Sequence, residues 1–384
     1  MRRDVLDIRF DTQAHWDTDA NTAQRKLGMF KGADPIRRAL GLSAVAKPDP
    51  TYGRVVETLV AVETNLNKPV GWSKPRWKAA KSKFETFTNR LTAIYKRAGT
   101  PLQGRVGPFC SFCEQRLAGE IQVEHLVPKG TYTHMWLPWN NFALACGPCN
   151  TSKLGKPNWA TSSAWGPFAD AIARVVAIRD HYLWVDTSGA LAYQLLKPVL
   201  WWEDAGTWRT VDHPVHPDTR WRSRNPDTRE VRADVHSTAG GAVGPATHLN
   251  VPVQVEIAAS GGGANLAKAQ RTMTQWDPNR VVPNPDDSLY DQRMFNRTQA
   301  WVKLVPAARL AVNANVAAFN GQWDTFLLAA EGWGQFSVVL RILELLNAAG
   351  IPDPTGAAPT VMQRFLTDVN GQNIYPGTAT AGLP

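Results

Sequence analysis

Cysteine is scarce in this chain, and long apolar runs are missing. Four cysteines among 384 residues are too few to hold together a disulfide-rich secreted scaffold. No stretch of 18 consecutive apolar residues occurs, so the sequence predicts no transmembrane helix and no membrane partner. The arginines near the N-terminus are not followed by an apolar segment, which is untypical of a secretory signal. We therefore expect a cytoplasmic protein whose cysteines stay reduced.

Acidic residues are in deficit, but only in the first part of the chain. The net charge is +9. Residues 1–100 contain 19 Lys and Arg against 10 Asp and Glu, and residues 101–160 contain 5 against 3. Residues 161–384 contain 18 against 20. A polyanion would therefore dock on the first 160 residues, and nucleic acid is the commonest such partner. A basic face that only maintains solubility is the alternative.

Most of this basic excess lies in one predicted helix. Nine basic residues and one acidic residue occur between Lys68 and Arg97, while apolar residues recur at steps of three and four from Trp77 to Ile94. This pattern predicts an amphipathic helix over about 74–97 with a basic outer face. We expect this face to contact nucleic-acid phosphates through Lys74, Arg76, Lys78, Lys81, Lys83 and Arg90.

All four cysteines fall in two pairs with the same spacing. Cys110 and Cys113 form the first pair, Cys146 and Cys149 form the second, and 32 residues separate the pairs. Each pair can form a tight metal-binding turn, called a knuckle, and two knuckles can bring four thiolates into a tetrahedron around Zn²⁺. The alternative, a redox-active dithiol, needs one pair rather than two. A zinc ion with four thiolates has no open position for water, so this zinc would be structural.

Polar residues suited to catalysis lie between and just after the pairs. Glu124 and His125 are adjacent in a short predicted strand, so their side chains should point to opposite faces. Asn141 precedes a second apolar strand, and Asn150 begins a predicted helix at the second knuckle. The order is therefore strand, loop, strand, helix. A zinc ribbon without catalysis is the alternative interpretation.

These residues resemble the HNH endonucleases, whose ββα-metal finger carries an acid-His pair, an Asn, and a final His or Asn. The resemblance covers residues 105–158 and is to the subtype framed by two CxxC pairs. It implies that His125 is the general base, that Asn141 orients this base, and that Glu124 and Asn150 bind the catalytic ion. Lys153, in the predicted helix, is a candidate catalytic residue that would contact the scissile or a flanking phosphate, and an exposed helix lysine is the alternative. Lys129 is a candidate for contact with nucleic acid.

Two residues depart from the usual family pattern. Asn150 replaces histidine, and Glu124 replaces the commoner aspartate. Both changes favour a hard, oxygen-liganded ion, so we expect Mg²⁺ or Mn²⁺ as the catalytic cofactor beside the structural Zn²⁺.

The finger is also similar to the HNH nucleases of the Septu and retron anti-phage defence systems. That likeness implies DNA as substrate and an ABC-type ATPase, encoded nearby, as partner. Because one HNH centre cuts one strand at a time, double-strand cutting would favour a homodimer. The alternatives are a nuclease activated by a ligand bound to a C-terminal sensor domain, and a non-catalytic zinc-stabilised nucleic-acid-binding protein.

The expected fold class is α+β, with three parts. Residues 1–104 should be mostly helical and basic, and residues 105–160 should form the zinc-stapled finger. Residues 161–384 should be a mixed region that serves as a sensor, partner-binding or accessory domain. Within it, the pattern predicts short strands over 181–256, helices over 290–348 and an irregular tail from Pro352.

Overall fold

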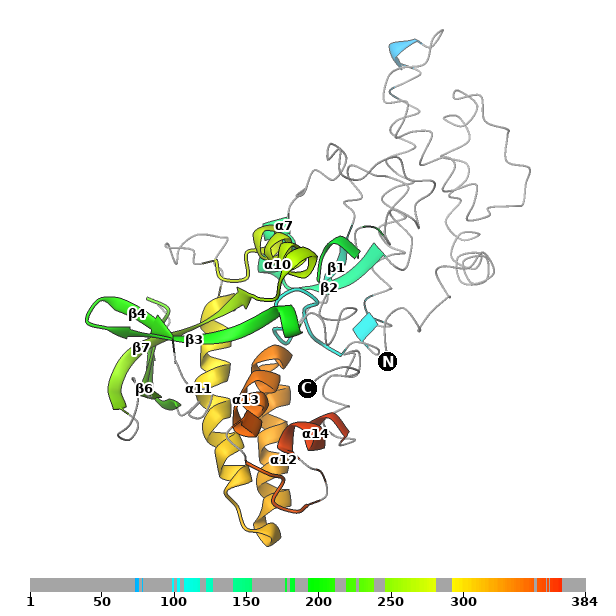
Figure 1. Cartoon of the computed structure of the whole chain (residues 1–384). Coiled ribbons are helices and arrows are strands. Elements are labelled where there is room, and N and C mark those ends of the chain that lie inside the picture. The colour runs from blue at the N-terminus through cyan, green and yellow to red at the C-terminus, as the bar shows by residue number, and fades with distance from the viewer. Residues whose placement is uncertain are drawn as a thin grey trace.

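The computed structural model describes residues 73–75, 78, 99, 102–103, 107–117, 122–126, 141–153, 177, 180–183, 193–210, 219–225, 228–237, 246–280, 292–348, 351–356, 358 and 360–367. These residues form α-helices and two antiparallel sheets, which confirms the α+β class (Figure 1). Among the helices of this described part, none is both long enough and apolar enough to cross a membrane.

A five-stranded antiparallel sheet organises the C-terminal region. Its strands are β3 (Leu196–Asp204), β4 (Thr207–Thr210), β5 (Thr219–Asn225), β6 (Glu230–Ser237) and β7 (Ala246–Ala259), in the spatial order β4-β3-β7-β6-β5. Buried residues alternate along these strands, as with Leu200 and Trp202 in β3 and Val253 and Val255 in β7. Since strand side chains alternate between faces, one face of the sheet forms the core. The strands expected over 181–256 are therefore confirmed.

The helices of this region are α10 (Gly263–Trp276), α11 (Arg293–Val312), α12 (Val316–Trp333), α13 (Phe336–Ala348) and α14 (Val361–Thr367). Helices α10, α11 and α13 contact the sheet, whereas α12 packs on α11 and α14 packs on α13. Helix α11 contacts β5, β6 and β7 on one side and α12 and α13 on the other, so it lies at the centre of the region (Figure 1). The helices expected over 290–348 are confirmed. The prediction of an irregular tail from Pro352 is wrong in part, because α14 lies within it. Val361, Met362 and Phe365 are buried against the core and hold this helix in place.

A smaller unit lies beside α10. Strands β1 (Gln122–His125) and β2 (Phe142–Ala145) pair antiparallel, and α7 (Gly147–Lys153) follows β2 directly. Helix α7 contacts both β1 and α10. The predicted order of strand, strand and helix is therefore present, and this unit lies against the C-terminal region (Figure 1).

The first cysteine knuckle is joined to the C-terminal core. Phe109 belongs to the same buried cluster as the sheet and helices α11 to α14. Gln115 forms an antiparallel bridge with Gly334 at the end of α12, and Gln335 donates its backbone N–H to the Glu114 carbonyl at 3.0 Å. Residues more than 200 positions apart in sequence thus form one packed structure.

The predicted basic helix lies largely outside the described residues. Lys74 and Lys78 have helical backbone and are exposed. Arg76, Lys81, Lys83, Arg90 and Lys129 lie outside the described residues, so their nucleic-acid contacts stay predictions.

Candidate metal centre and finger

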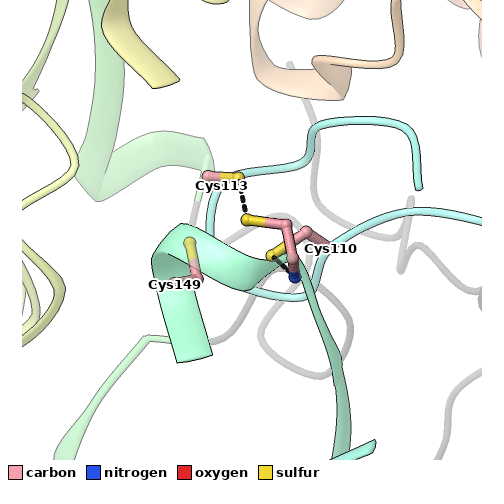
Figure 2. A group of neighbouring side chains, drawn as sticks. Cys110, Cys113 and Cys149 are labelled. Atoms are coloured by element: carbon pink, nitrogen blue, oxygen red, sulfur yellow. Dashed lines mark hydrogen bonds between the residues drawn. The ribbon is translucent and has the colours of Figure 1, made fainter. Parts of the chain in front are cut away.

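Four cysteines from three segments converge at one point. Cys110 and Cys113 lie in the turn after Phe109, Cys146 follows β2, and Cys149 is in the first turn of α7. Their four Sγ atoms all lie within 4.8 Å of one another, and three of them are labelled in Figure 2. Tetrahedral zinc with Zn–S bonds of about 2.3 Å requires S···S separations of about 3.8 Å. The Cys113–Cys146 separation is 3.7 Å. The predicted clustering of the two pairs is therefore confirmed, and the cluster fits a metal ion such as Zn²⁺.

Backbone hydrogen bonds fold the first knuckle around the sulfurs. Glu114 donates its N–H to the Cys110 carbonyl at 2.9 Å, and Cys110 donates to the Gln115 carbonyl at 2.9 Å. Glu114 takes a positive φ of 63° to close this turn. Cys146 donates its backbone N–H to Cys110 Sγ at 3.4 Å, which links the two knuckles and stabilises a thiolate at Cys110.

The thiols differ in acidity because they share protons. Burial acts to raise the pKa of Cys110, but hydrogen bonds from the other three thiols outweigh it and hold the pKa well below its ordinary value. Hydrogen bonding to Cys110 raises the pKa of Cys113, and burial raises the pKa of Cys149. A metal ion that binds all four sulfurs would displace these protons, so metal binding and proton release are coupled.

Strand β1 separates Glu124 from His125. Its residues alternate in burial: Val123 and His125 are buried, while Gln122 is exposed and Glu124 is half-buried. The two candidate catalytic side chains therefore lie on opposite faces, as predicted. His125 is only 2% exposed, and its ring meets Phe142 edge-on with centroids 5.2 Å apart. The histidine is thus the more buried member of the pair.

Asn150 lies on the same face of β1 as Glu124. Its Nδ2 donates to Gln122 Oε1 at 3.0 Å, and Gln122 shares a face with Glu124 because the two are separated by one residue in the strand. This bond engages the amide Nδ2, whereas a metal ion would be bound by the amide oxygen Oδ1, so the contact with Gln122 leaves Asn150 able to act as a ligand together with Glu124. The sequence analysis missed Gln122, although its spacing from Glu124 could have indicated a shared face.

Asn141 and Lys153 lie at the two ends of this unit. Asn141 is fully buried just before β2, and its carbonyl accepts the N–H of Leu126 at 2.8 Å. It is thus bonded to the residue next to His125. Lys153 is the last residue of α7, and its side chain lies outside the described part. The catalytic roles of all these residues, and the catalytic Mg²⁺ or Mn²⁺, stay predictions.

Residues of the C-terminal region complete the surroundings of the cysteines. Arg293 Nη1 lies 3.6 Å from Cys149 Sγ. Glu114 Oε2 accepts the backbone N–H of Ser337 at 2.8 Å and the Ser337 hydroxyl at 2.6 Å. Burial raises the pKa of Glu114 and lowers the pKa of Arg297 to about 10. No local sequence pattern indicated Arg293, Arg297 or Ser337, because they come from helices far along the chain from the cysteines.

A cavity of about 50 Å³ adjoins the cluster. The first knuckle lines it with Phe112, Cys113 and Glu114, and the C-terminal region with Trp276, Arg297 and others. Phe112 and Trp276 also pack ring against ring, with centroids 5.4 Å apart. The cavity therefore follows the boundary between the knuckle and the C-terminal region.

Comparison of the chain with protein-family models, with curated proteins and with solved structures finds no match in any of the three.

Proposed function

We propose that the chain is a metal-dependent endonuclease that hydrolyses DNA phosphodiester bonds at the unit formed by β1, β2 and α7. One observation supports this proposal best: a four-cysteine cluster fastens a two-stranded sheet to a helix, with Glu124 and Asn150 on one face of β1 and His125 on the other. This arrangement offers oxygen ligands and an imidazole from neighbouring positions.

In the proposed reaction, His125 accepts a proton from the attacking water. An imidazole with an ordinary pKa near 6.5 does this well at neutral pH. Glu124 and Asn150 would hold Mg²⁺ or Mn²⁺, which supplies stabilisation of the charge that develops on the phosphate and on the leaving oxygen. Asn141 would orient the histidine, and Lys153 with the basic N-terminal residues would hold the DNA backbone. The four cysteines would hold Zn²⁺ for structure alone.

The burial of His125 favours a nuclease that needs activation. A side chain that is 2% exposed cannot reach a bulk water molecule without a local opening, and a general base must lie within hydrogen-bond distance of the water it activates. We therefore favour activation by a partner, in keeping with a defence effector that acts with an ATPase. Activation by a ligand at the C-terminal region is the second form of the same proposal.

The proposal is tested with supercoiled plasmid, Mg²⁺ or Mn²⁺, and purified full-length protein. We expect the wild type to cut once it is activated, with the candidate ATPase and ATP present where they are required, and His125→Ala and Glu124→Gln to cut at least roughly 100-fold more slowly under the same conditions. His181→Ala is the matched histidine control, because His181 lies outside this unit and pairs its ring with Tyr182. Equal zinc content in all four proteins would exclude loss of folding. The assay is repeated with the candidate ATPase and ATP.

A second candidate function is a non-catalytic, zinc-stabilised nucleic-acid-binding protein. The edge-on contact between His125 and Phe142 favours it, because that contact is typical of a histidine with a packing role. This alternative predicts DNA binding that His125→Ala leaves unchanged, and no cleavage with any divalent ion or partner.

A further inference from the structure

Two buried arginines of helix α11 lie beside the four-cysteine cluster. Arg293 is 1% exposed and Arg297 is 2% exposed, and their spacing of four residues places them on one face of the helix. Arg293 Nη1 lies 3.6 Å from Cys149 Sγ and donates to the Trp276 carbonyl at 2.7 Å. Arg297 lines the same cavity as Cys113. Helix α11 therefore places one guanidinium group against a cysteine sulfur and a second on the cavity that Cys113 lines.

The charge of a zinc-loaded cluster is opposite in sign to these arginines. Four thiolates and one Zn²⁺ leave a net charge of about −2, and two guanidinium groups contribute about +2 because arginine stays protonated in proteins. The buried acid Glu114 also interacts with Arg297, so Arg297 faces both the cluster and this side chain. Burying a charge is costly unless an opposite charge lies close to it. Arginine is also suited to this position because its fork of donors can bind a sulfur and a carbonyl at once.

Arg297 is fixed by the C-terminal sheet and the turn after α10, and Arg293 by the carbonyl of Trp276 at the end of α10. Arg297 donates to the carbonyls of Val255 and Pro278 and to Asn279 Oδ1, at 3.2–3.3 Å. Thr298, the next residue, accepts the Val255 N–H at 2.8 Å. The two guanidinium groups therefore stay with the C-terminal region if the knuckles separate from it. For this reason, zinc binding and the packing of the knuckles on α11 should depend on each other.

We propose that Arg293 and Arg297 are positioning residues of the zinc centre, which is thus shared between the finger and the C-terminal region. In this arrangement the two guanidinium groups neutralise the zinc–thiolate cluster, and zinc holds the knuckles against α11. Residues 161–384 are then an integral part of the metal site rather than a detachable accessory. The proposal concerns zinc alone and stands whether or not the finger cleaves DNA.

The first experiment measures zinc affinity of the full-length protein by competition with a chromophoric chelator. We expect Arg293→Met to lose roughly 10- to 100-fold in affinity, as is usual when a hydrogen-bond donor to a ligand is removed. Arg293→Lys keeps the positive charge but loses the paired N–H donors of the guanidinium group, so its zinc affinity should decrease less than that of Arg293→Met. Lys303→Met removes an exposed positive charge from the same helix and should bind zinc like the wild type. In the cobalt-substituted protein, Arg293→Met should move the thiolate-to-cobalt absorption band to longer wavelength.

The second experiment needs no variant. Zinc is removed from the wild type with a chelator, and amide hydrogen exchange is followed along the chain. The proposal predicts faster exchange in the first turns of α11 and at the end of α10, as well as in residues 107–153. Faster exchange confined to residues 107–153, or equal zinc affinity in Arg293→Met and Lys303→Met, would overturn the proposal.

Discussion

Gly334 joins the first knuckle to the C-terminal helices, and Gly334→Ala should break this junction. Gly334 has φ 69° and ψ −136°, a combination open to glycine and costly for residues with a Cβ. A Cβ added there would lie 2.7 Å from the Glu114 carbonyl oxygen and 2.9 Å from the Arg116 nitrogen. Both are backbone atoms of the knuckle, so the clash is relieved only if the knuckle moves.

The expected loss follows from two terms. Backbone strain of this kind costs about 1–3 kcal/mol, and overpacking of a tight site costs about 1–3 kcal/mol more. Gly334→Ala should therefore reduce the free energy of unfolding by about 2–6 kcal/mol, a large part of the ~5–15 kcal/mol typical of a domain. The matched control is Gly332→Ala in α12, where an added Cβ meets nothing within 4 Å and should stabilise the helix by up to about 1 kcal/mol.

Urea unfolding measures both variants, followed by tryptophan fluorescence and by zinc release to a chromophoric chelator. We expect the two signals to shift to lower urea together in Gly334→Ala, because the knuckle and the C-terminal core share this junction. A difference of about 0.5 kcal/mol is typical of neutral surface changes. If the free energies of unfolding of Gly334→Ala and Gly332→Ala differ by no more than this, the described packing of the knuckle on α12 and α13 is refuted.

Three further predictions concern metal, pH and salt. Cys113→Ser should contain less than one zinc per chain when zinc is measured by atomic absorption. It should also unfold at a lower urea concentration, because structural zinc binding contributes folding free energy. An unchanged urea midpoint would contradict this prediction. Burial, with Arg271 and Lys268 nearby, lowers the pKa of His181 to about 4. The His181 imidazole takes up a proton near pH 6.5 in the unfolded chain, so the free energy of unfolding should fall as the pH falls from about 6.5 to 4. His181→Asn should reduce that fall by about 1–2 kcal/mol after allowance for solvent screening. Identical pH profiles for the wild type and the variant would contradict this prediction. DNA affinity should decrease with salt concentration, and replacing Lys74 and Lys78 by glutamine should lower the slope of log K against log salt by about 1–2; an unchanged slope would place the DNA elsewhere.

Local patterns in the sequence predicted the elements that local physics controls. The spacing of Cys110, Cys113, Cys146 and Cys149 predicted a four-thiol cluster, and their Sγ atoms converge. Alternation in β1 placed Glu124 and His125 on opposite faces. The sequence over 290–348 predicted helices, and α11 to α13 lie there.

Contacts between residues far apart in the chain could not be predicted from local sequence patterns. Arg293 lies 144 residues from Cys149, and Ser337 lies 223 residues from Glu114, so no local pattern relates the members of either pair. The irregular tail was predicted from its glycines and prolines, yet Phe365 becomes helical because the core buries it. Tertiary contacts decide such segments, and short helices have little stability of their own.

The central claim is that His125 acts as the base of a DNA-cleaving centre. It is tested most directly by the rate of plasmid cleavage, measured with Mg²⁺ or Mn²⁺, for wild type and His125→Ala of equal zinc content. The account predicts cleavage by the wild type, with the candidate ATPase present if activation is required, and a rate at least roughly 100-fold lower for the variant. Equal rates in the two proteins, or no cleavage by the wild type under any of these conditions, would contradict it.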